Sequence, residues 1–125
     1  MNVLSIGIDA TDIPRVAEMV ARYGDRFLRR VFTGGELAYC NRHRNPAPHL
    51  AGRFAAKEAA MKALGTAHAA GVLWQDVEVV RADGAPRLLL HGTAAERAAA
   101  LHVARSLVTI THAESLAFAQ VMLLG

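Results

Sequence analysis

One long segment between Pro48 and Gly65 constrains the fold of this chain more than any other part of its sequence. The segment is rich in alanine, which has the highest helix propensity, and it also carries strong helix formers such as Lys57, Glu58 and Met61. Glycine is favoured just after the last turn of a helix, so Gly65 marks its end. The sequence therefore predicts its longest helix over residues 48–65.

The rest of the chain alternates between strand and helix patterns. Apolar residues in alternation predict strands at residues 3–9, 73–80, 87–91, 106–112 and 116–123. Capping residues and apolar periodicity predict further helices at residues 12–23, 33–40 and 94–102. Gly7 permits a close backbone approach to the first strand. This order, with adjacent hairpins, predicts an α+β fold with a small, mostly antiparallel sheet packed on the long helix.

Length and composition indicate how the chain is organised. The 125 residues suit a single core, so one domain over residues 1–125 is predicted. Hydrophobic residues make up 53% and charged residues 20%, as is typical of a folded globular chain. No run of about 18 apolar residues is present, so we expect no membrane span. Cys40 is the only cysteine, and a reducing cytoplasm is the expected compartment.

Positive charge is concentrated in the first half of the chain. Residues 1–62 carry 10 basic and 6 acidic groups, whereas residues 63–125 carry 4 basic and 5 acidic groups. This excess either attracts phosphates or an acidic protein, or it is a solvated surface in a chain that prefers arginine. Of the 14 basic residues, only Lys57 and Lys62 are lysines. Both fall in one short segment, which indicates a chemical requirement for lysine there.

Three positions are candidates for a reactive site. Glu58 and Lys62 share a helix face, either as a surface ion pair or as a metal-binding carboxylate beside a phosphate-binding ammonium. Asp9 ends the first strand, where it either caps a helix or pairs with Glu58. Two carboxylates with phosphate oxygens suit Mg²⁺, which binds few protein ligands. His112 ends a later strand and is either structural or at the rim of a polar site.

Five ordered blocks of sequence together resemble a known family. The blocks are Gly7–Asp9 with Ile13 and Arg15, Phe32–Cys40, Ala51–Thr66, Trp74–Val79 with Gly84–Pro86, and Thr109–His112. In this order and spacing they are similar to holo-acyl-carrier-protein synthase, the small single-domain type of 4′-phosphopantetheinyl transferase. The resemblance covers nearly the whole chain.

The resemblance implies a reaction and a set of ligands. A magnesium-dependent enzyme would transfer 4′-phosphopantetheine from coenzyme A to a serine of an apo-acyl carrier protein, releasing adenosine 3′,5′-bisphosphate, in fatty acid or polyketide biosynthesis. Asp9 and Glu58 would hold Mg²⁺, and Lys62 would act with them in catalysis. The residues expected at coenzyme A are Arg53, Lys57, Lys62, Gly65, Gly84, Pro86 and His112.

The resemblance also implies protein partners. The acidic carrier protein would dock on Arg15, Met19 and Arg22, and three copies of the chain would form a homotrimer with sites between subunits. The chain departs from the family pattern at Ala67, where glycine is usual, and at Thr109, where serine is common. These departures affect the shape of the pocket and not the class of protein.

Two other functions compete with this hypothesis. A nucleic-acid binder would use the arginine-rich first half, but aromatic residues make up only 6% of the chain and are not interleaved with a basic patch. We therefore expect no nucleic-acid partner. A catalytically inactive homologue is the second alternative, and the presence of Asp9, Glu58 and Lys62 speaks against it.

Overall fold

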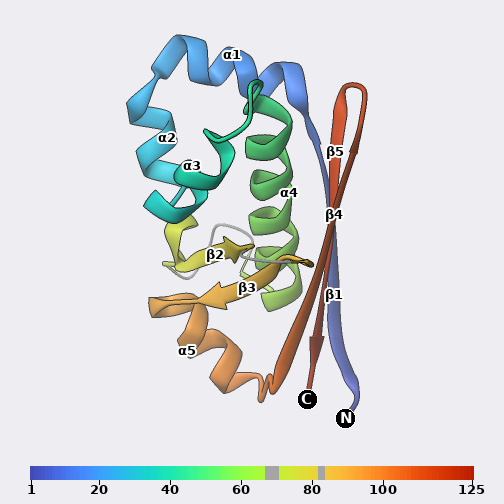
Figure 1. Cartoon of the computed structure of the whole chain (residues 1–125). Helices are drawn as coiled ribbons and strands as arrows, with labels where there is room; N and C mark the ends of the chain where they lie inside the picture. Colours follow the sequence, from blue (N-terminus) through green and yellow to red (C-terminus); the bar gives the residue numbers. More distant parts are fainter. Residues whose placement is uncertain (67–70, 82–83) are drawn as a thin grey trace.

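Helix α4 lies at the centre of the molecule, between a three-stranded sheet and a layer of shorter helices (Figure 1). The computed structural model describes residues 1–66, 71–81 and 84–125. Its helices are α1 (Ile13–Tyr23), α2 (Asp25–Val31), α3 (Gly34–Cys40), α4 (Ala47–Leu64) and α5 (Gly92–Ala100), with a 3₁₀ turn η1 (Trp74–Asp76). Its strands are β1 (Val3–Asp12), β2 (Val77–Val80), β3 (Arg87–Leu90), β4 (Arg105–Ala113) and β5 (Leu116–Leu124).

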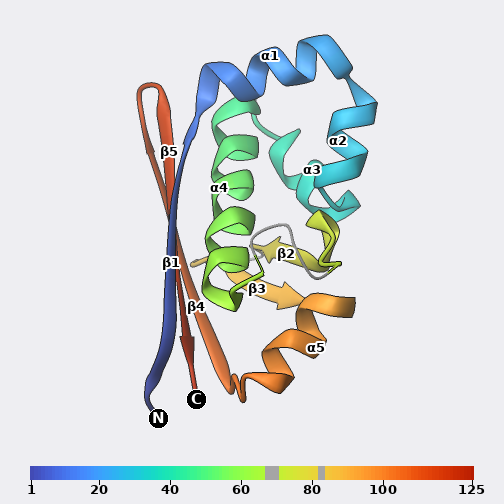
Figure 2. The same ribbon diagram turned by 180° about the vertical axis from the view of Figure 1, so that it is seen from behind.

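The strands form two antiparallel sheets. The larger sheet has the order β1-β5-β4, and β2 pairs with β3 in a separate hairpin. Gln120 on the middle strand lies opposite Ile8 on one side and Thr109 on the other. The two ends of the chain lie side by side, where β1 begins and β5 ends (Figure 2). This arrangement confirms the predicted α+β class, with a small antiparallel sheet packed on a long helix.

Close packing of β1 against α4 explains why the helix is rich in alanine. Ala55 and Ala59 are fully buried. Gly7 faces the same helix, and a Cβ atom built on it would lie 1.9 Å from the carbonyl oxygen of Ala59. Any side chain at position 7 would therefore collide with the backbone of α4. The close approach predicted for Gly7 is confirmed.

Two apolar clusters lie around α4. The first joins α4 to the larger sheet, to the β2–β3 hairpin and to α5. The second joins the first half of α4 to α1, α2 and α3, and its buried members are Ile13, Val16, Val31, Phe32, Cys40, Leu50, Ala51 and Ala117. Within the described residues, no helix combines the length and the apolar character needed to cross a membrane.

Helix α2 is an element that the sequence patterns did not indicate. It has only seven residues and follows Gly24, whose φ of 53° turns the chain between two helices. So short a helix depends on packing more than on intrinsic propensity. The packing comes from burial of Val31 and from an edge-to-face contact between the rings of Phe27 and Phe32.

The predicted strand over residues 73–80 is wrong in its first half. Residues 74–76 form η1, because the Asp76 carboxylate accepts a hydrogen bond from the Leu73 backbone N–H and bends the chain. Only Val77–Val80 pairs as a strand. Part of the turn predicted at Asp83 and Gly84 lies outside the described residues, since the description resumes at Gly84.

The face of the larger sheet that points away from α4 is exposed and apolar. In both views, no described helix covers this face (Figures 1 and 2). We call it the apolar sheet face, and its large exposed side chains are Leu4, Ile6, Ile8, Leu107, Leu116 and Phe118. Ile8 is 62% exposed, which is a high value for an isoleucine within a strand.

Candidate active site

The end of β1 meets the start of α1 and the middle of α4 around an open cavity of about 490 Å³. Three predicted residues line this cavity together: Asp9 from β1, and Glu58 and Lys62 from α4. Two residues predicted to contact the carrier protein, Arg15 and Met19, line it from α1. We call this cavity the carboxylate pocket. The fold thus joins residues that are about 50 positions apart in the sequence.

Both carboxylate oxygens of Asp9 contact donors from the protein. Lys62 Nζ lies 2.9 Å from Asp9 Oδ1 and donates a second hydrogen bond to the carbonyl oxygen of Ile8, at 3.1 Å. The Thr11 hydroxyl donates to Asp9 Oδ2 at 3.2 Å. The Lys62 side chain is half exposed, so its ammonium group is accessible from the cavity.

The donor set of the carboxylate pocket fits Mg²⁺. Asp9, Asp12 and Glu58 all line the cavity and offer hard oxygen ligands. Across the described ranges, no three acidic, histidine or cysteine side chains are close enough to enclose a metal. Magnesium binds typically through one or two carboxylates, with water and substrate phosphates completing its octahedron. An open pocket with few protein ligands suits that chemistry better than it suits a structural zinc site.

A second cavity, of about 250 Å³, lies where the start of α4 meets the end of β4. Four of its lining residues carry cationic or titratable nitrogen groups: His49, Arg53, Arg81 and His112. We call it the arginine–histidine pocket. Among the described residues, its lining includes no acidic side chain, so its chemistry favours an anion such as a phosphate.

Arg53 is the most buried of these cations. It is only 3% exposed, and its Nε has no hydrogen-bond partner within the described part of the chain. Its guanidinium group lies over the ring of Tyr39, with 4.0 Å between Cζ and the ring centroid. A buried donor without a partner is costly, so a ligand that accepts a hydrogen bond would be favoured here.

Histidine rings form one wall of the arginine–histidine pocket. His43 and His49 stack with their centroids 3.6 Å apart, and His112 meets His49 edge-on at 5.8 Å. Burial lowers the pKa of His49 most, and together with the positive charges nearby it brings that pKa to about 4. Those charges belong to His43, Arg53, His112 and Arg81. At neutral pH, His49 is therefore an uncharged ring beside the guanidinium groups of Arg53 and Arg81.

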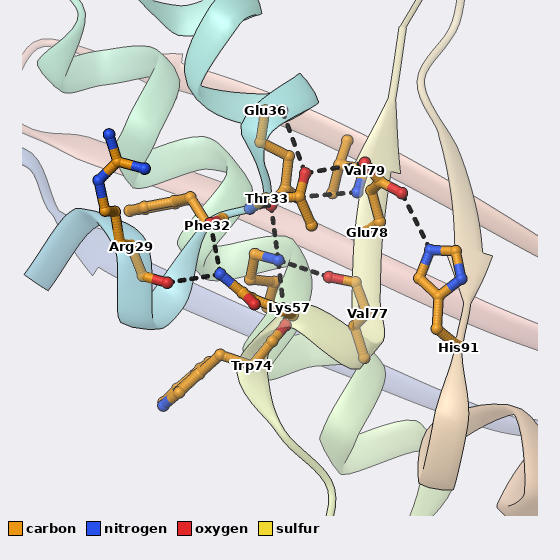
Figure 3. Close-up of polar contacts among 11 residues, drawn as sticks. Arg29, Phe32, Thr33, Glu36, Lys57, Trp74, Val77, Glu78, Val79 and His91 are labelled. Atoms are coloured by element: carbon orange, nitrogen blue, oxygen red, sulfur yellow. Dashed lines mark hydrogen bonds and ion pairs between the residues drawn. The ribbon is translucent and has the colours of Figure 1, made fainter.

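Lys57, which the resemblance places at coenzyme A, lies inside the fold and lines neither pocket as described. The side chain is fully buried, and its Nζ lies 2.8 Å from Glu36 Oε1. Its other acceptors are the carbonyl oxygens of Trp74 and Val77, as Figure 3 shows. An ammonium group has three donors, and here each has an acceptor. These donors are already used inside the fold, so the contact between Lys57 and coenzyme A stays a prediction that this geometry does not support.

Glu36 is a residue whose role the sequence did not reveal. Its capping box with Thr33 is confirmed, because Thr33 N–H donates to Glu36 Oε1 at 2.8 Å and the Thr33 hydroxyl accepts from Glu36 N–H. The other carboxylate oxygen accepts from Val79 N–H, at 2.8 Å (Figure 3). One fully buried carboxylate thus connects α3, α4 and β2. Only the capping signal was visible in the sequence.

The remaining predicted residues lie outside the two pockets. Gly65 ends α4 with φ at 73°, as predicted for a residue just beyond a helix. Gly84 is linked to the arginine–histidine pocket, because Arg81 Nε donates to its carbonyl oxygen at 2.9 Å. Pro86 follows two residues later, immediately before β3. Arg22 is exposed on α1, and its Cζ lies 5.4 Å from the centroid of the Tyr23 ring. Ala67 lies outside the described residues.

Comparison with known proteins identifies the family. The model of the 4′-phosphopantetheinyl transferase superfamily matches residues 5–119. A holo-[acyl-carrier-protein] synthase of Koribacter versatilis is 45% identical over 122 residues, which cover 97% of this chain and 98% of the relative. One from Nitratidesulfovibrio vulgaris is 48% identical with the same coverage. The chain belongs to the 4′-phosphopantetheinyl transferase superfamily, which confirms the predicted class.

Solved structures agree with this assignment. The holo-[acyl-carrier-protein] synthase of Neisseria meningitidis superposes with a TM-score of 0.89 at 25% identity, covering 99% of this chain and all of that one. The Helicobacter pylori synthase, solved in complex with coenzyme A, has a TM-score of 0.81 at 28% identity, covering 95% of this chain and 99% of the other. The fold of this chain is that of these synthases.

Proposed function

We propose that this chain transfers 4′-phosphopantetheine from coenzyme A to a serine of an apo-acyl carrier protein, as its relatives' names indicate for them. The observation that carries the proposal is the meeting of Asp9, Glu58 and Lys62 in one open pocket. The match to relatives over nearly the whole chain supports it. Fatty acid or polyketide biosynthesis as the setting, and the cytoplasm as the compartment, stay predictions from the sequence.

The residues of the two pockets fit the demands of this reaction. The serine oxygen forms a bond to the phosphorus that carries pantetheine, the P–O bond within the pyrophosphate breaks, and adenosine 3′,5′-bisphosphate leaves. Negative charge gathers on the phosphate oxygens, where the Lys62 ammonium would stabilise it. Mg²⁺, held by Asp9 and Glu58, would supply further charge neutralisation when bound. Glu58 is the proposed acceptor of the serine proton.

Phosphate groups remote from the reacting bond require a second binding region. The arginine–histidine pocket offers Arg53 and His112, the two residues that the resemblance places at coenzyme A and that lie together in this cavity. No described residue accepts a hydrogen bond from the buried Arg53 Nε, so a phosphate oxygen would satisfy it. This supports binding of the nucleotide end of coenzyme A at this pocket.

The carrier protein would approach along α1. Arg15 and Arg22 are exposed on that helix, and Met19 is partly exposed. A groove of about 370 Å³ adjoins the carboxylate pocket and shares Met19, Phe27 and Phe54 with it. Its lining also includes Arg26 and Arg30 from α2. A basic rim around an apolar floor suits an acidic partner with apolar contact residues.

The two pockets lie at opposite edges of the larger sheet, which supports the proposed trimer. The carboxylate pocket is lined by β1 and the arginine–histidine pocket by β4, with β5 between them. Within the described part of the chain, the two pockets share no lining residue. If the β1 edge of one copy met the β4 edge of the next, the pockets would join across the interface. Head-to-tail contacts that close give a ring. In such a ring, the apolar sheet face of each copy would be covered.

Intact-protein mass spectrometry tests the proposed reaction directly. An apo-acyl carrier protein mixed with this chain, coenzyme A and Mg²⁺ should gain the mass of one phosphopantetheine. The gain should be lost with a chelator and with the Asp9→Ala variant. If a panel of unrelated apo carriers gained no mass and the chain also failed to bind coenzyme A in calorimetry, the proposed function would be wrong.

A further inference from the structure

We propose that Tyr39 is a positioning residue: its ring fixes the guanidinium group of Arg53 toward the arginine–histidine pocket without neutralising its charge. Tyr39 belongs to α3 and does not line the pocket, whereas Arg53 belongs to α4 and does. The proposal rests on the proposed function, because it assigns Arg53 to the phosphates of coenzyme A.

The geometry leaves Tyr39 as the contact that places this cation. The guanidinium carbon of Arg53 lies 4.0 Å from the centroid of the Tyr39 ring, well within the range of a cation–π interaction. Arg53 is 3% exposed, so water does not solvate its charge fully. In the described ranges, no ion pair joins Arg53 to a carboxylate, and its Nε has no hydrogen-bond partner.

A second buried cation on the same helix shows what a carboxylate would do instead. Lys57 lies four residues after Arg53, one helical turn away, and it is neutralised by Glu36 at 2.8 Å. All three donors of the Lys57 ammonium group are used by acceptors within the protein. An aromatic ring holds a cation in place through its negative π face, yet it carries no net charge. Arg53 therefore keeps its full positive charge for an anion that enters the pocket.

The surroundings of Tyr39 hold its ring in position. The His43 and His49 rings both meet the Tyr39 ring edge-on, with ring centroids 5.2 Å and 6.1 Å from the Tyr39 centroid. These two histidines stack on each other. Arg42 lies 5.0 Å from the ring centroid. The same histidine stack reaches the pocket wall through His49. A substitution at Tyr39 should therefore alter the arginine–histidine pocket and leave the carboxylate pocket unchanged.

The test compares Tyr39→Leu, which removes the π face, with Tyr39→Phe, which keeps it. Tyr39→Leu should raise the KM for coenzyme A, and the calorimetric Kd of adenosine 3′,5′-bisphosphate, by about three- to tenfold with little change in kcat. Tyr39→Phe should resemble the native chain. Leu37→Ala, on the same helix, is the control: it should lower the melting temperature and leave the Kd unchanged.

A double variant distinguishes a positioning role from a structural one. Arg53→Met alone should weaken binding of the bisphosphate, and Tyr39→Leu should add no further weakening in the Arg53→Met background. If Arg53→Met weakens binding but Tyr39→Leu does not, the positioning role is wrong and the proposed function stands. If Arg53→Met itself binds as tightly as the native chain, the assignment of Arg53 to coenzyme A fails, and the inference falls with it. Should Tyr39→Leu not fold, Tyr39→Met removes the π face with a smaller change in shape.

Discussion

At the scale of single residues, the burial of Lys57 has a consequence for stability. Its ammonium group and the Glu36 carboxylate are both fully buried. Burial lowers the pKa of Lys57, and the nearby charge of Glu36 opposes that shift. Lys57→Met would leave the Glu36 carboxylate buried without its counter-ion, so we expect the free energy of unfolding to fall by about 3–5 kcal/mol. Urea denaturation of the two proteins measures the difference.

A matched double variant separates the charge effect from lost packing. Glu36→Gln combined with Lys57→Met removes both charges, and Gln keeps one oxygen to accept from the Val79 N–H. The double variant should recover part of the lost stability, because no uncompensated charge stays buried. Equal loss in the single and the double variants would show that the ion pair itself is not what stabilises this region.

His49 should make the protein less stable in acid. Its pKa is lowered to about 4 in the folded chain, chiefly by burial, from an ordinary value of 6.5. Below pH 6.5, His49 therefore binds a proton in the unfolded chain but not in the folded chain. The stability of the folded protein then falls as the pH drops toward 4. His49→Phe keeps an aromatic ring for the stack but cannot titrate. The melting temperature of this variant should fall less steeply between pH 6.5 and pH 4 than that of the native chain. Parallel slopes would contradict this.

Residue chemistry and the resemblance together predicted which side chains meet in the carboxylate pocket, but they did not predict the burial of Lys57. Asp9, Glu58 and Lys62 were selected by their chemistry and by the resemblance, and the fold brings all three to one cavity. Lys57 sits beside Glu58 in the same motif, yet its side chain contacts the β2 strand and does not line the carboxylate pocket. Its three acceptors come from α3, η1 and β2, and no local pattern shows that these elements would close over it.

At the scale of elements, the crossing of β1 and α4 sets the position of Asp9 relative to Glu58. A Cβ atom at Gly7 would lie 1.9 Å from the Ala59 carbonyl oxygen, so Gly7→Ala must push the strand away from the helix. We expect a loss of about 3 kcal/mol or more in the free energy of unfolding. Thermal denaturation and circular dichroism measure it.

Gly34→Ala, at the first position of α3, is the matched control for this substitution. A Cβ atom there would meet no heavy atom within 4 Å among the described residues. The same chemical change should therefore alter stability by no more than about 1 kcal/mol, since only helix propensity is affected. If Gly7→Ala were as well tolerated as Gly34→Ala, the close packing of β1 on α4 would be wrong.

The elements themselves were predictable in proportion to their length and periodicity. The long helix over residues 48–65 and the final hairpin are present close to where the sequence placed them. Helix α2 was not predicted, because seven residues carry too little periodicity. Its stability comes from contacts such as that between Phe27 and Phe32. The start of the predicted strand at residue 73 failed because the Asp76 side chain competes for the Leu73 N–H.

At the scale of the whole molecule, the apolar sheet face predicts self-association. Ile6 is 52% exposed and Ile8 is 62% exposed on that face. Size-exclusion chromatography with light scattering should give the native protein a mass of about three times the 13.4 kDa of one chain. Ile6→Lys would place a charge on the face and should yield single chains. Ala99→Lys, on an exposed part of α5, should leave the assembly intact. An unchanged mass for Ile6→Lys would exclude this face as the interface.

The position of the two pockets at opposite sheet edges leads to a sharper test of the assembly. Asp9→Ala disables the carboxylate pocket, and Arg53→Met disables the arginine–histidine pocket. Each variant alone should be nearly inactive at low coenzyme A. If every site takes Asp9 from one copy and Arg53 from the next, co-refolding equal amounts should restore about a quarter of the native activity, because random mixing leaves that fraction of interfaces with both groups intact. If each site lies within one chain, mixing restores nothing, and the proposed sharing of sites between subunits is wrong.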